Sequence, residues 1–218
     1  MTKKQEENGT ADQILRSAAR QFRQNGIGNT TLRGIAKDAG VLLGTVHYWF
    51  PSKEAILLAL TERAGGRVQN AINDAIADEA DPSRRLWLAF RAYLNVLISD
   101  TAITTVLLYE YRPREGREWQ TVNRLREEFD RLWDGLIHQA VGAGGIRPGL
   151  NLNMVRQFGL GAINWLPQWY SEDGDLTVDE IARQFADFFA RGVFVQDRVD
   201  DWILETSSKA SAVNKIGE

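Results

Sequence analysis

The apolar positions near the N-terminus recur every three or four residues and are separated by glycines. Over residues 11–25 this spacing predicts an amphipathic helix that buries one face. Thr10 precedes the helix and Gln13 stands three residues later, which matches a capping box at the helix start. Gly26 can end the helix, because glycine readily takes the left-handed conformation found after the last turn.

Two shorter helical blocks follow. Thr31 can cap a helix that Gly40 stops, and the turn 41–44 leads into a third short helix over residues 45–50. After Pro51 and a capping Ser52, the chain reads as longer helices separated by Pro- and Gly-containing breaks. We predict these longer helices over residues 53–78, 83–99, 101–112, 115–142, 151–170 and 177–196. Since no segment alternates apolar and polar residues as a strand does, the predicted fold class is all-α.

Two short capped helices joined by a tight turn are typical of a helix-turn-helix. In that motif the second helix lies in the major groove of DNA and the first braces it. Gly40 supplies the turn, Ala39 and Val46 are small enough to let the two helices touch, and Thr45 and Tyr48 are left outside. We therefore treat the segment from Thr10 to Lys53, here called the reading head, as a predicted DNA-binding unit.

The reading head resembles the TetR family of transcriptional regulators. Residues 30–41 read TTLRGIAKDAGV and residues 44–54 read GTVHYWFPSKE, against a family run of T-x-x-x-I-A-x-x-A-G-V-S-x-G-x-x-Y-x-x-F-x-S-K-E. The resemblance implies a three-helix DNA-binding domain over 1–54 and a helical effector-binding and dimerisation domain over 55–200. The Ser/Ala/Lys-rich segment 201–218 is expected to be a flexible tail.

The resemblance also implies roles for residues of the reading head. Thr31 can offer its hydroxyl and backbone N–H to a phosphate, or can be a plain helix cap, and Thr45 is the expected base reader. The full set of predicted DNA contacts is Thr31, Arg33, Leu43, Gly44, Thr45, His47, Tyr48 and Lys53. Leu42 stands where the family usually has Ser, and Leu43 where a polar residue is common. Readout at this end is therefore expected to use apolar contact with thymine methyl groups, and the operator preference should be atypical.

Aromatic residues are frequent in the body of the chain, residues 55–200, which contains five of the seven tryptophans. They form either an ordinary aromatic core or the lining of a cavity for a planar or apolar effector. The cavity that the resemblance implies would be lined by Trp87, Tyr93, Tyr109, Trp133 and Trp165. The segment 158–170 resembles regulators of fatty-acid and steroid breakdown that respond to acyl-CoA thioesters. An arginine-rich stretch over 112–117 is either a phosphate contact for such a ligand or an exposed loop.

The last two predicted long helices carry aromatic and small residues in alternation. By family resemblance they form a two-fold dimer interface, and a dimer would read two half-sites about 34–36 Å apart. The predicted interface residues are Phe158, Ala162, Phe185, Phe188 and Phe189. Gly159 and Gly161 would let helices approach closely.

The composition bears on the location of the protein in the cell, on its charge distribution and on its need for a cofactor or metal. The chain has no cysteine and no apolar run of about 20 residues, so we expect a cytoplasmic protein that does not enter a membrane. Residues 1–60 carry eight basic and five acidic residues, whereas the remainder carries 18 and 24, which places the excess of positive charge on the reading head. We expect no cofactor and no metal, since neither ligand spacings nor a phosphate loop appear.

Two other classes of protein compete with a DNA-binding regulator. An all-helical enzyme is disfavoured because the two histidines are far apart and no carboxylate pair is marked out for acid–base chemistry. A binding or scaffold protein with a purely structural helix-turn-helix remains open. Repression, relieved by a small-molecule effector, is the family default, and activation is not distinguishable in the sequence.

Overall fold

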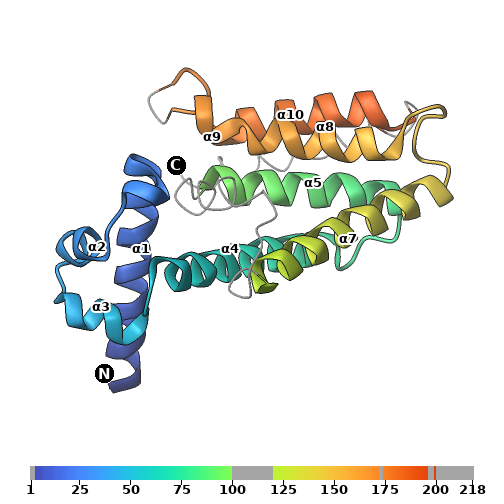
Figure 1. Ribbon diagram of the computed structural model, residues 1–218. Coiled ribbons are helices and arrows are strands. Elements are labelled where there is room, and N and C mark those ends of the chain that lie inside the picture. The colour runs from blue at the N-terminus through green and yellow to red at the C-terminus, as the bar shows by residue number, and fades with distance from the viewer. Residues whose placement is uncertain (1–2, 100–119, 172–173, 196–198, 200–218) are drawn as a thin grey trace, which may run out of the picture. The chain divides into compact units, whose positions relative to one another are not determined.

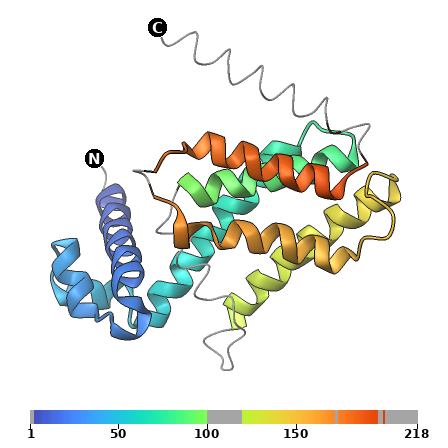
Figure 2. The ribbon, with the colours of Figure 1, turned by 90° about the horizontal axis from the view of Figure 1, so that it is seen from above.

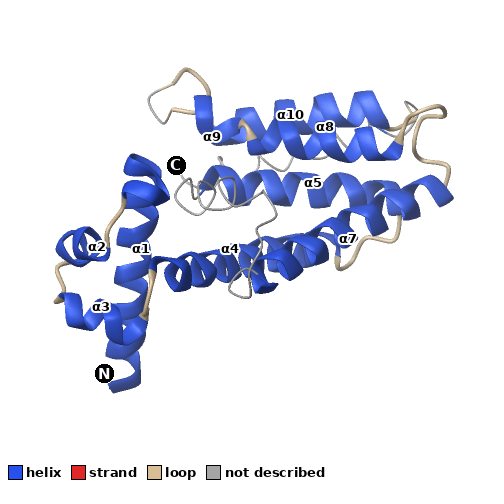
Figure 3. Cartoon of the chain, in the orientation of Figure 1, coloured by secondary structure: helices blue, strands red, loops and turns tan. Residues whose placement is uncertain are grey.

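The computed structural model describes residues 3–99, 120–171, 174–195 and 199. Throughout these ranges the regular structure is helical (Figure 3), and the sole β-type pairing there is an isolated antiparallel bridge between Ile146 and Phe194. The helices are α1 (Lys3–Asn29), α2 (Leu32–Ala39), α3 (Leu43–Trp49), α4 (Lys53–Ile76), α5 (Pro82–Ser99), α7 (Gln120–Gly142), α8 (Leu152–Asn164), α9 (Leu166–Trp169) and α10 (Val178–Val193). The all-α prediction is confirmed. The expected helix over 101–112 and the tail over 201–218 lie outside the described residues.

The chain divides into two compact units. The first comprises residues 1–67 and 100–129, and the second comprises residues 68–99 and 130–218. Both α4 and α7 begin in the first unit and continue into the second. No helix in the described ranges is long and apolar enough to cross a membrane.

The first unit is built around the three helices of the reading head, which lie close together in Figure 1. Its core contains apolar side chains from α1, α2, α3 and the first turns of α4, together with one from the start of α7. Phe22, Ile35, Val46 and Leu57 are fully buried in it. These residues are spaced to face one side of each short helix. Burying them together holds α2 and α3 against α1, since a helix of seven or eight residues is not stable alone.

The start of α1 differs from the prediction. The helix begins at Lys3 and not after Thr10, so Thr10 lies inside the helix and not at its N-cap position. The residues before Thr10 include Gln and Glu, which are good helix formers, and the helix propagates through them. Gly26 does interrupt the helical conformation as expected, with φ 75° and ψ 155°.

In the second unit α10 packs against α5 and α8, as Figures 1 and 2 show from two directions. Trp87, Phe90, Trp133 and Phe194 are among its largest fully buried side chains. Arg156 of α8 ties that helix to α7 through ion pairs of 2.8 Å to Asp130 and 3.3 Å to Asp134. The second unit is thus held together by buried aromatic side chains and by the ion pairs of Arg156 between α8 and α7.

The segment predicted as one helix over 151–170 forms two. Asn151 caps α8 by accepting the N–H of Met154 at 3.1 Å, and α8 ends at Asn164. A one-turn helix, α9, follows, with Pro167 near its start. Because proline has no N–H to donate to an earlier carbonyl, a break here is expected on chemical grounds. Thr177 and Glu180 form a reciprocal capping box at the start of α10.

Candidate nucleic-acid interface

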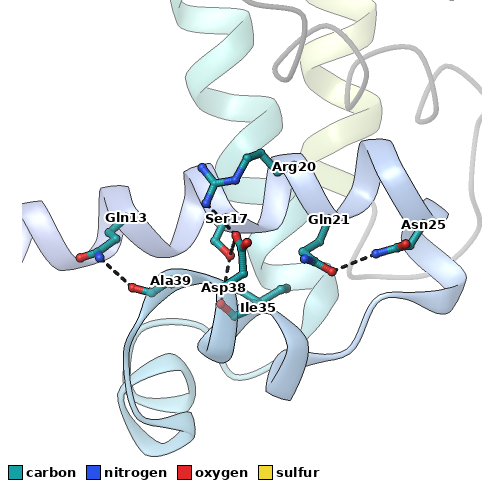
Figure 4. A network of polar contacts seen from close by, with 8 residues as sticks. All are labelled: Gln13, Ser17, Arg20, Gln21, Asn25, Ile35, Asp38 and Ala39. Carbon is teal, nitrogen blue, oxygen red and sulfur yellow. Dashed lines mark hydrogen bonds and ion pairs between the residues drawn. The ribbon is translucent and has the colours of Figure 1, made fainter.

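A polar network fixes α2 on α1 (Figure 4). The hydroxyl oxygen of Ser17 lies 3.0 Å from the carbonyl oxygen of Ile35 and 2.7 Å from Oδ2 of Asp38. Arg20 donates to the same carboxylate oxygen at 2.6 Å, and Gln13 donates to the carbonyl of Ala39 at 2.7 Å. All of these bonds join α1 to residues 35–39 of α2, so they set the position from which the turn to α3 departs.

Asp38 is the charged centre of this network. Its pKa is lowered below the usual range, first by the hydrogen bond from the Ser17 hydroxyl and then by the hydrogen bond and charge of Arg20. The carboxylate is therefore kept ionised, and its ionised form is the one that holds Ser17 and Arg20. No sequence motif marks this network, although Ser17 stands three residues after Ile14, at the spacing of the buried stripe.

The turn between α2 and α3 is shorter than predicted, because α3 begins at Leu43 and not at residue 45. The predicted end of α2 and its cap do form. The Thr31 hydroxyl accepts the N–H of Gly34 at 3.0 Å, which caps α2. Gly40 ends α2 with φ 66°, and Val41 donates its N–H to the carbonyl of Ala36 at 3.0 Å. The backbone must take the left-handed conformation at this position, and glycine adopts that conformation without strain.

The orientation of α3 separates its inward and outward residues. Val46 is fully buried, and Leu43 and Trp49 pack, partly buried, against the core of the reading head. Gly44, His47 and Tyr48 are exposed, with 80% of Tyr48 accessible, and Thr45 is half-buried. The structure thus places three of the predicted readers on the outward side of α3 and Leu43 on the inward side.

The helix α3 lacks a side-chain cap. Leu42 occupies the N-cap position with φ −71° and ψ 147°, and its side chain makes no capping hydrogen bond. It is 79% exposed. The departure from the family pattern at this position therefore puts a bare apolar side chain at the start of the predicted recognition helix.

The predicted cationic contacts lie in different surroundings. Arg33 is exposed on α2. The Lys53 ammonium donates to the carbonyl of Ile27 at 2.9 Å and to that of Gly28 at 3.3 Å. Lys53 is only partly exposed, and its charge is used to hold the end of α1 that follows the Gly26 break.

Three of the predicted effector residues lie in the interior of the second unit. Trp87, Tyr93 and Trp133 are buried, and the rings of Tyr93 and Trp133 meet edge to face with centroids 5.8 Å apart. Tyr93 donates its hydroxyl to Oδ1 of Asn164 at 2.6 Å, a polar contact within an aromatic surround. Trp165 is not part of this group, since its side chain is 65% exposed. Tyr109, like the arginine-rich stretch over 112–117, lies outside the described residues.

The residues predicted for the dimer interface differ in how exposed they are. Phe158 of α8 and Phe188 of α10 are each about two-thirds exposed, and Ala162 and Phe185 are half-buried. Phe189, in contrast, is buried and stacks on Phe90 with centroids 4.1 Å apart and the planes 8° from parallel.

The two glycines of α8 differ in the same way. Gly159 lies against this aromatic pair, because a Cβ there would sit 2.8 Å from Cε2 of Phe189. A Cβ at Gly161 would meet nothing within 4 Å. The close helix approach that the sequence predicted therefore occurs within the chain, at Gly159.

Elsewhere in the described parts of the chain, no group of three His, Cys, Asp or Glu side chains is placed to hold a metal ion. The structure thus offers two sets of residues with functional character. One is the exposed side of α3 with Leu42, and the other is the aromatic interior of the second unit with the exposed aromatic residues on α8 and α10.

Two protein-family models match this chain, one in its N-terminal part and one in the part that follows. Residues 14–60 match the family model described as bacterial regulatory proteins of the tetR family, and residues 79–193 match the model described as the tetracyclin repressor-like C-terminal domain. Together these matches cover most of the reading head and most of the helical body that follows it. Their order along the chain is the order expected from the sequence.

Individual relatives support the same assignment. The fatty acid metabolism regulator protein of Bacillus subtilis is 24% identical over 83% of this chain and 94% of its own length. The HTH-type transcriptional repressor KstR2 of Rhodococcus jostii is 25% identical over 85% of this chain and 92% of its own length. Among solved structures, AibR in complex with isovaleryl coenzyme A and operator DNA has the same fold, with a TM-score of 0.73 at 22% identity over 83% of this chain and 98% of that one.

Proposed function

This chain belongs to the TetR family of bacterial regulatory proteins, and from that premise we propose that it is a ligand-responsive repressor of transcription. In this proposal a dimer occupies operator DNA and leaves it when a small apolar or acyl-CoA-like effector binds. Residues 1–54 would contact DNA, and residues 55–200 would bind the effector and dimerise. The relatives are transcriptional regulators, which favours regulation over catalysis as the activity of this chain.

The exposed side of α3 is the observation that carries the DNA-binding proposal. A short helix that buries Val46 while leaving Gly44, His47 and Tyr48 accessible has a free face of the size that enters the major groove. Arg33 is exposed on α2 and the Thr31 hydroxyl marks the start of that helix, so both can serve as phosphate contacts that set the register.

The aromatic interior of the second unit supports an apolar effector. Trp87, Tyr93 and Trp133 offer apolar surface, and the bond between Tyr93 and Asn164 offers one polar point that can orient a ligand. AibR was crystallised with isovaleryl coenzyme A, and the Bacillus relative is named for fatty acid metabolism. These names suggest an acyl thioester as the first class of effector to test.

The exposed aromatic residues on α8 and α10 support dimerisation. Met154 and Phe158 on α8 and Phe188 on α10 are all about two-thirds exposed, which is unusual for side chains of this kind. A second copy of the chain that packs its own α8 and α10 against them would bury these side chains from water. Phe189 is not part of the proposed interface, because it belongs to the core of its own chain.

Fluorescence anisotropy with labelled duplexes tests the DNA-binding proposal. The probe is the DNA upstream of the gene that encodes the chain, and the control is a duplex of the same composition in scrambled order. We expect tighter binding to the upstream DNA and a steep loss of affinity as salt rises, since phosphate contacts release counterions. Equal binding to both duplexes, or none, would contradict the proposal.

The same complex tests the effector. Isovaleryl-CoA and a long-chain acyl-CoA are titrated into the protein–DNA complex, with free coenzyme A as the control. We expect at least one thioester to lower the affinity for DNA by about 5- to 150-fold, the usual range of coupling between two sites. Release by free coenzyme A to the same extent would contradict an effector recognised through its acyl group.

A further inference from the structure

Two adjacent leucines at the start of α3 have opposite surroundings. Leu43 is partly buried and packs against the core of the reading head, so its side chain is used by the fold. Leu42 is 79% exposed and does not pack against that core. Apolar surface is stabilised when it is removed from water, so the exposed side chain of Leu42, with about four apolar carbon atoms, does not stabilise the fold by burial.

The backbone holds Leu42 in a defined place. Its carbonyl accepts the N–H of Thr45 at 2.9 Å and the N–H of Val46 at 3.2 Å, the first bonds of α3. Its side chain makes no capping bond, although this is the position where Ser, Thr, Asp or Asn would do so. Leu42 is therefore rigidly presented but contributes no side-chain interaction to the helix that it begins.

The surroundings of Leu42 on the outward side of α3 are open. Gly44 is exposed, and a Cβ at that position would meet nothing within 4 Å. Close packing within the chain therefore does not require a glycine at position 44. The space at this position, near Leu42, is open to an external group. The exposed neighbours His47 and Tyr48 can donate hydrogen bonds, whereas Leu42 has neither donor nor acceptor.

We propose that Leu42 determines operator specificity by contacting the 5-methyl group of a thymine in each half-site. This inference rests on the proposed function, because it assumes that α3 enters the major groove. In that groove thymine is the base that presents an apolar group, so an apolar side chain distinguishes it from cytosine without a hydrogen bond. The sequence predicted apolar readout at the Leu42–Leu43 pair without distinguishing the two side chains, and the packing of Leu43 on the core leaves Leu42 as the one that can reach a base.

The test compares thymine with deoxyuridine, which lacks only the 5-methyl group. The half-site is first obtained by selecting bound duplexes from a random pool with the full-length protein. Each thymine of the selected duplex is then replaced by deoxyuridine in turn, and the Kd is measured for the wild-type protein and for Leu42→Ala. We expect one position per half-site at which loss of the methyl weakens wild-type binding about fourfold, the value of one buried methyl-sized group. Leu42→Ala should be insensitive at that position.

Two variants separate contact from folding. Leu42→Ser restores a possible capping hydroxyl, so it should raise the unfolding temperature while losing the sensitivity to the methyl group. Leu43→Ala should lower the unfolding temperature and retain the sensitivity, since Leu43 belongs to the core.

The inference is overturned if no half-site thymine is sensitive to deoxyuridine, if the selected half-site lacks thymine, or if Leu42→Ala keeps the sensitivity. Each of these results leaves DNA binding itself standing. Failure of the protein to retain any duplex from the pool, in contrast, would overturn the proposed function as well.

Discussion

The hydroxyl oxygen of Ser17 lies 2.7 Å from a carboxylate oxygen of Asp38, and this contact joins the first two helices of the reading head. Ser17 is fully buried, whereas Asp38 lies at the surface and also pairs with Arg20. In this helix-turn-helix, α2 can brace α3 only if α2 is itself held in place. The Ser17–Asp38 contact is therefore a positioning element for α3, although neither residue lies on the exposed side of that helix.

Replacing Asp38 by Asn should make the stability of the protein less dependent on acid. The pKa of Asp38 is lowered in the folded state, so its ionised form stabilises the fold above the ordinary carboxyl pKa, about 3.9. That contribution is lost as the pH falls through the lowered folded pKa. We expect Asp38→Asn to be less stable than wild type by about 1–2 kcal/mol at neutral pH, with the difference shrinking toward pH 3.

Urea unfolding at a series of pH values measures this difference. Arg20→Gln serves as the matched control, since it removes the exposed partner and leaves the Ser17 bond in place. Its effect at neutral pH should be smaller than that of Asp38→Asn. A constant difference between wild type and Asp38→Asn from pH 7 to pH 3 would contradict the prediction.

Replacing Lys53 by Met should affect folding more than phosphate binding. The ammonium of Lys53 is bound to the carbonyls of Ile27 and Gly28, and its loss leaves these acceptors without that partner. We expect the free energy of unfolding to fall by about 1–3 kcal/mol. The slope of log K against log salt for operator binding should stay at the wild-type value.

Arg33→Gln provides the comparison, because Arg33 is exposed on α2. If Arg33 neutralises one phosphate, its removal should reduce the salt slope by about 0.9 per site and leave the unfolding temperature unchanged. A reduced slope for Lys53→Met would show that Lys53 also reaches a phosphate.

Adding a methyl group at Gly159 should destabilise the second unit. The new Cβ would lie 2.8 Å from Cε2 of Phe189 and 3.1 Å from Cε2 of Phe90, inside the stacked pair. Overpacking of this kind costs about 1–3 kcal/mol. Gly135→Ala on α7 is the matched control, since its Cβ would meet nothing within 4 Å and alanine favours a helix over glycine by about 1 kcal/mol. Thermal unfolding of both variants should therefore shift in opposite directions.

A charge on the exposed side of α8 or α10 should separate the proposed dimer. Phe158→Glu and Phe188→Glu each place a carboxylate among apolar side chains that a second copy would bury. Sedimentation velocity is expected to show a monomer for these variants, with the helical content unchanged. Val141→Glu changes an exposed apolar residue on α7 and should remain dimeric. Monomeric wild-type protein would contradict the interface outright.

Features that depend on neighbours in the sequence were predicted well. Thr31 caps α2, Gly40 ends it and Ser52 accepts the N–H of Ala55 at the start of α4, because each of these interactions closes within three or four residues. The helix over 101–112 was predicted on the same basis but lies outside the described residues. The helix start predicted at Thr10 was wrong, because the residues before Thr10 also favour a helix and α1 begins at Lys3.

The direction of individual side chains was decided only by the tertiary structure. Periodicity shows that Phe188 and Phe189 share a helix, yet packing against Phe90 turns Phe189 inward and leaves Phe188 in water. The same holds for Leu42 and Leu43, which are chemically identical and adjacent. Local spacing and backbone chemistry in the sequence were enough to identify the family, most of the helices and the caps at Thr31, Gly40 and Ser52. Which apolar side chains remain free to bind a partner depended on how distant helices fill space against one another.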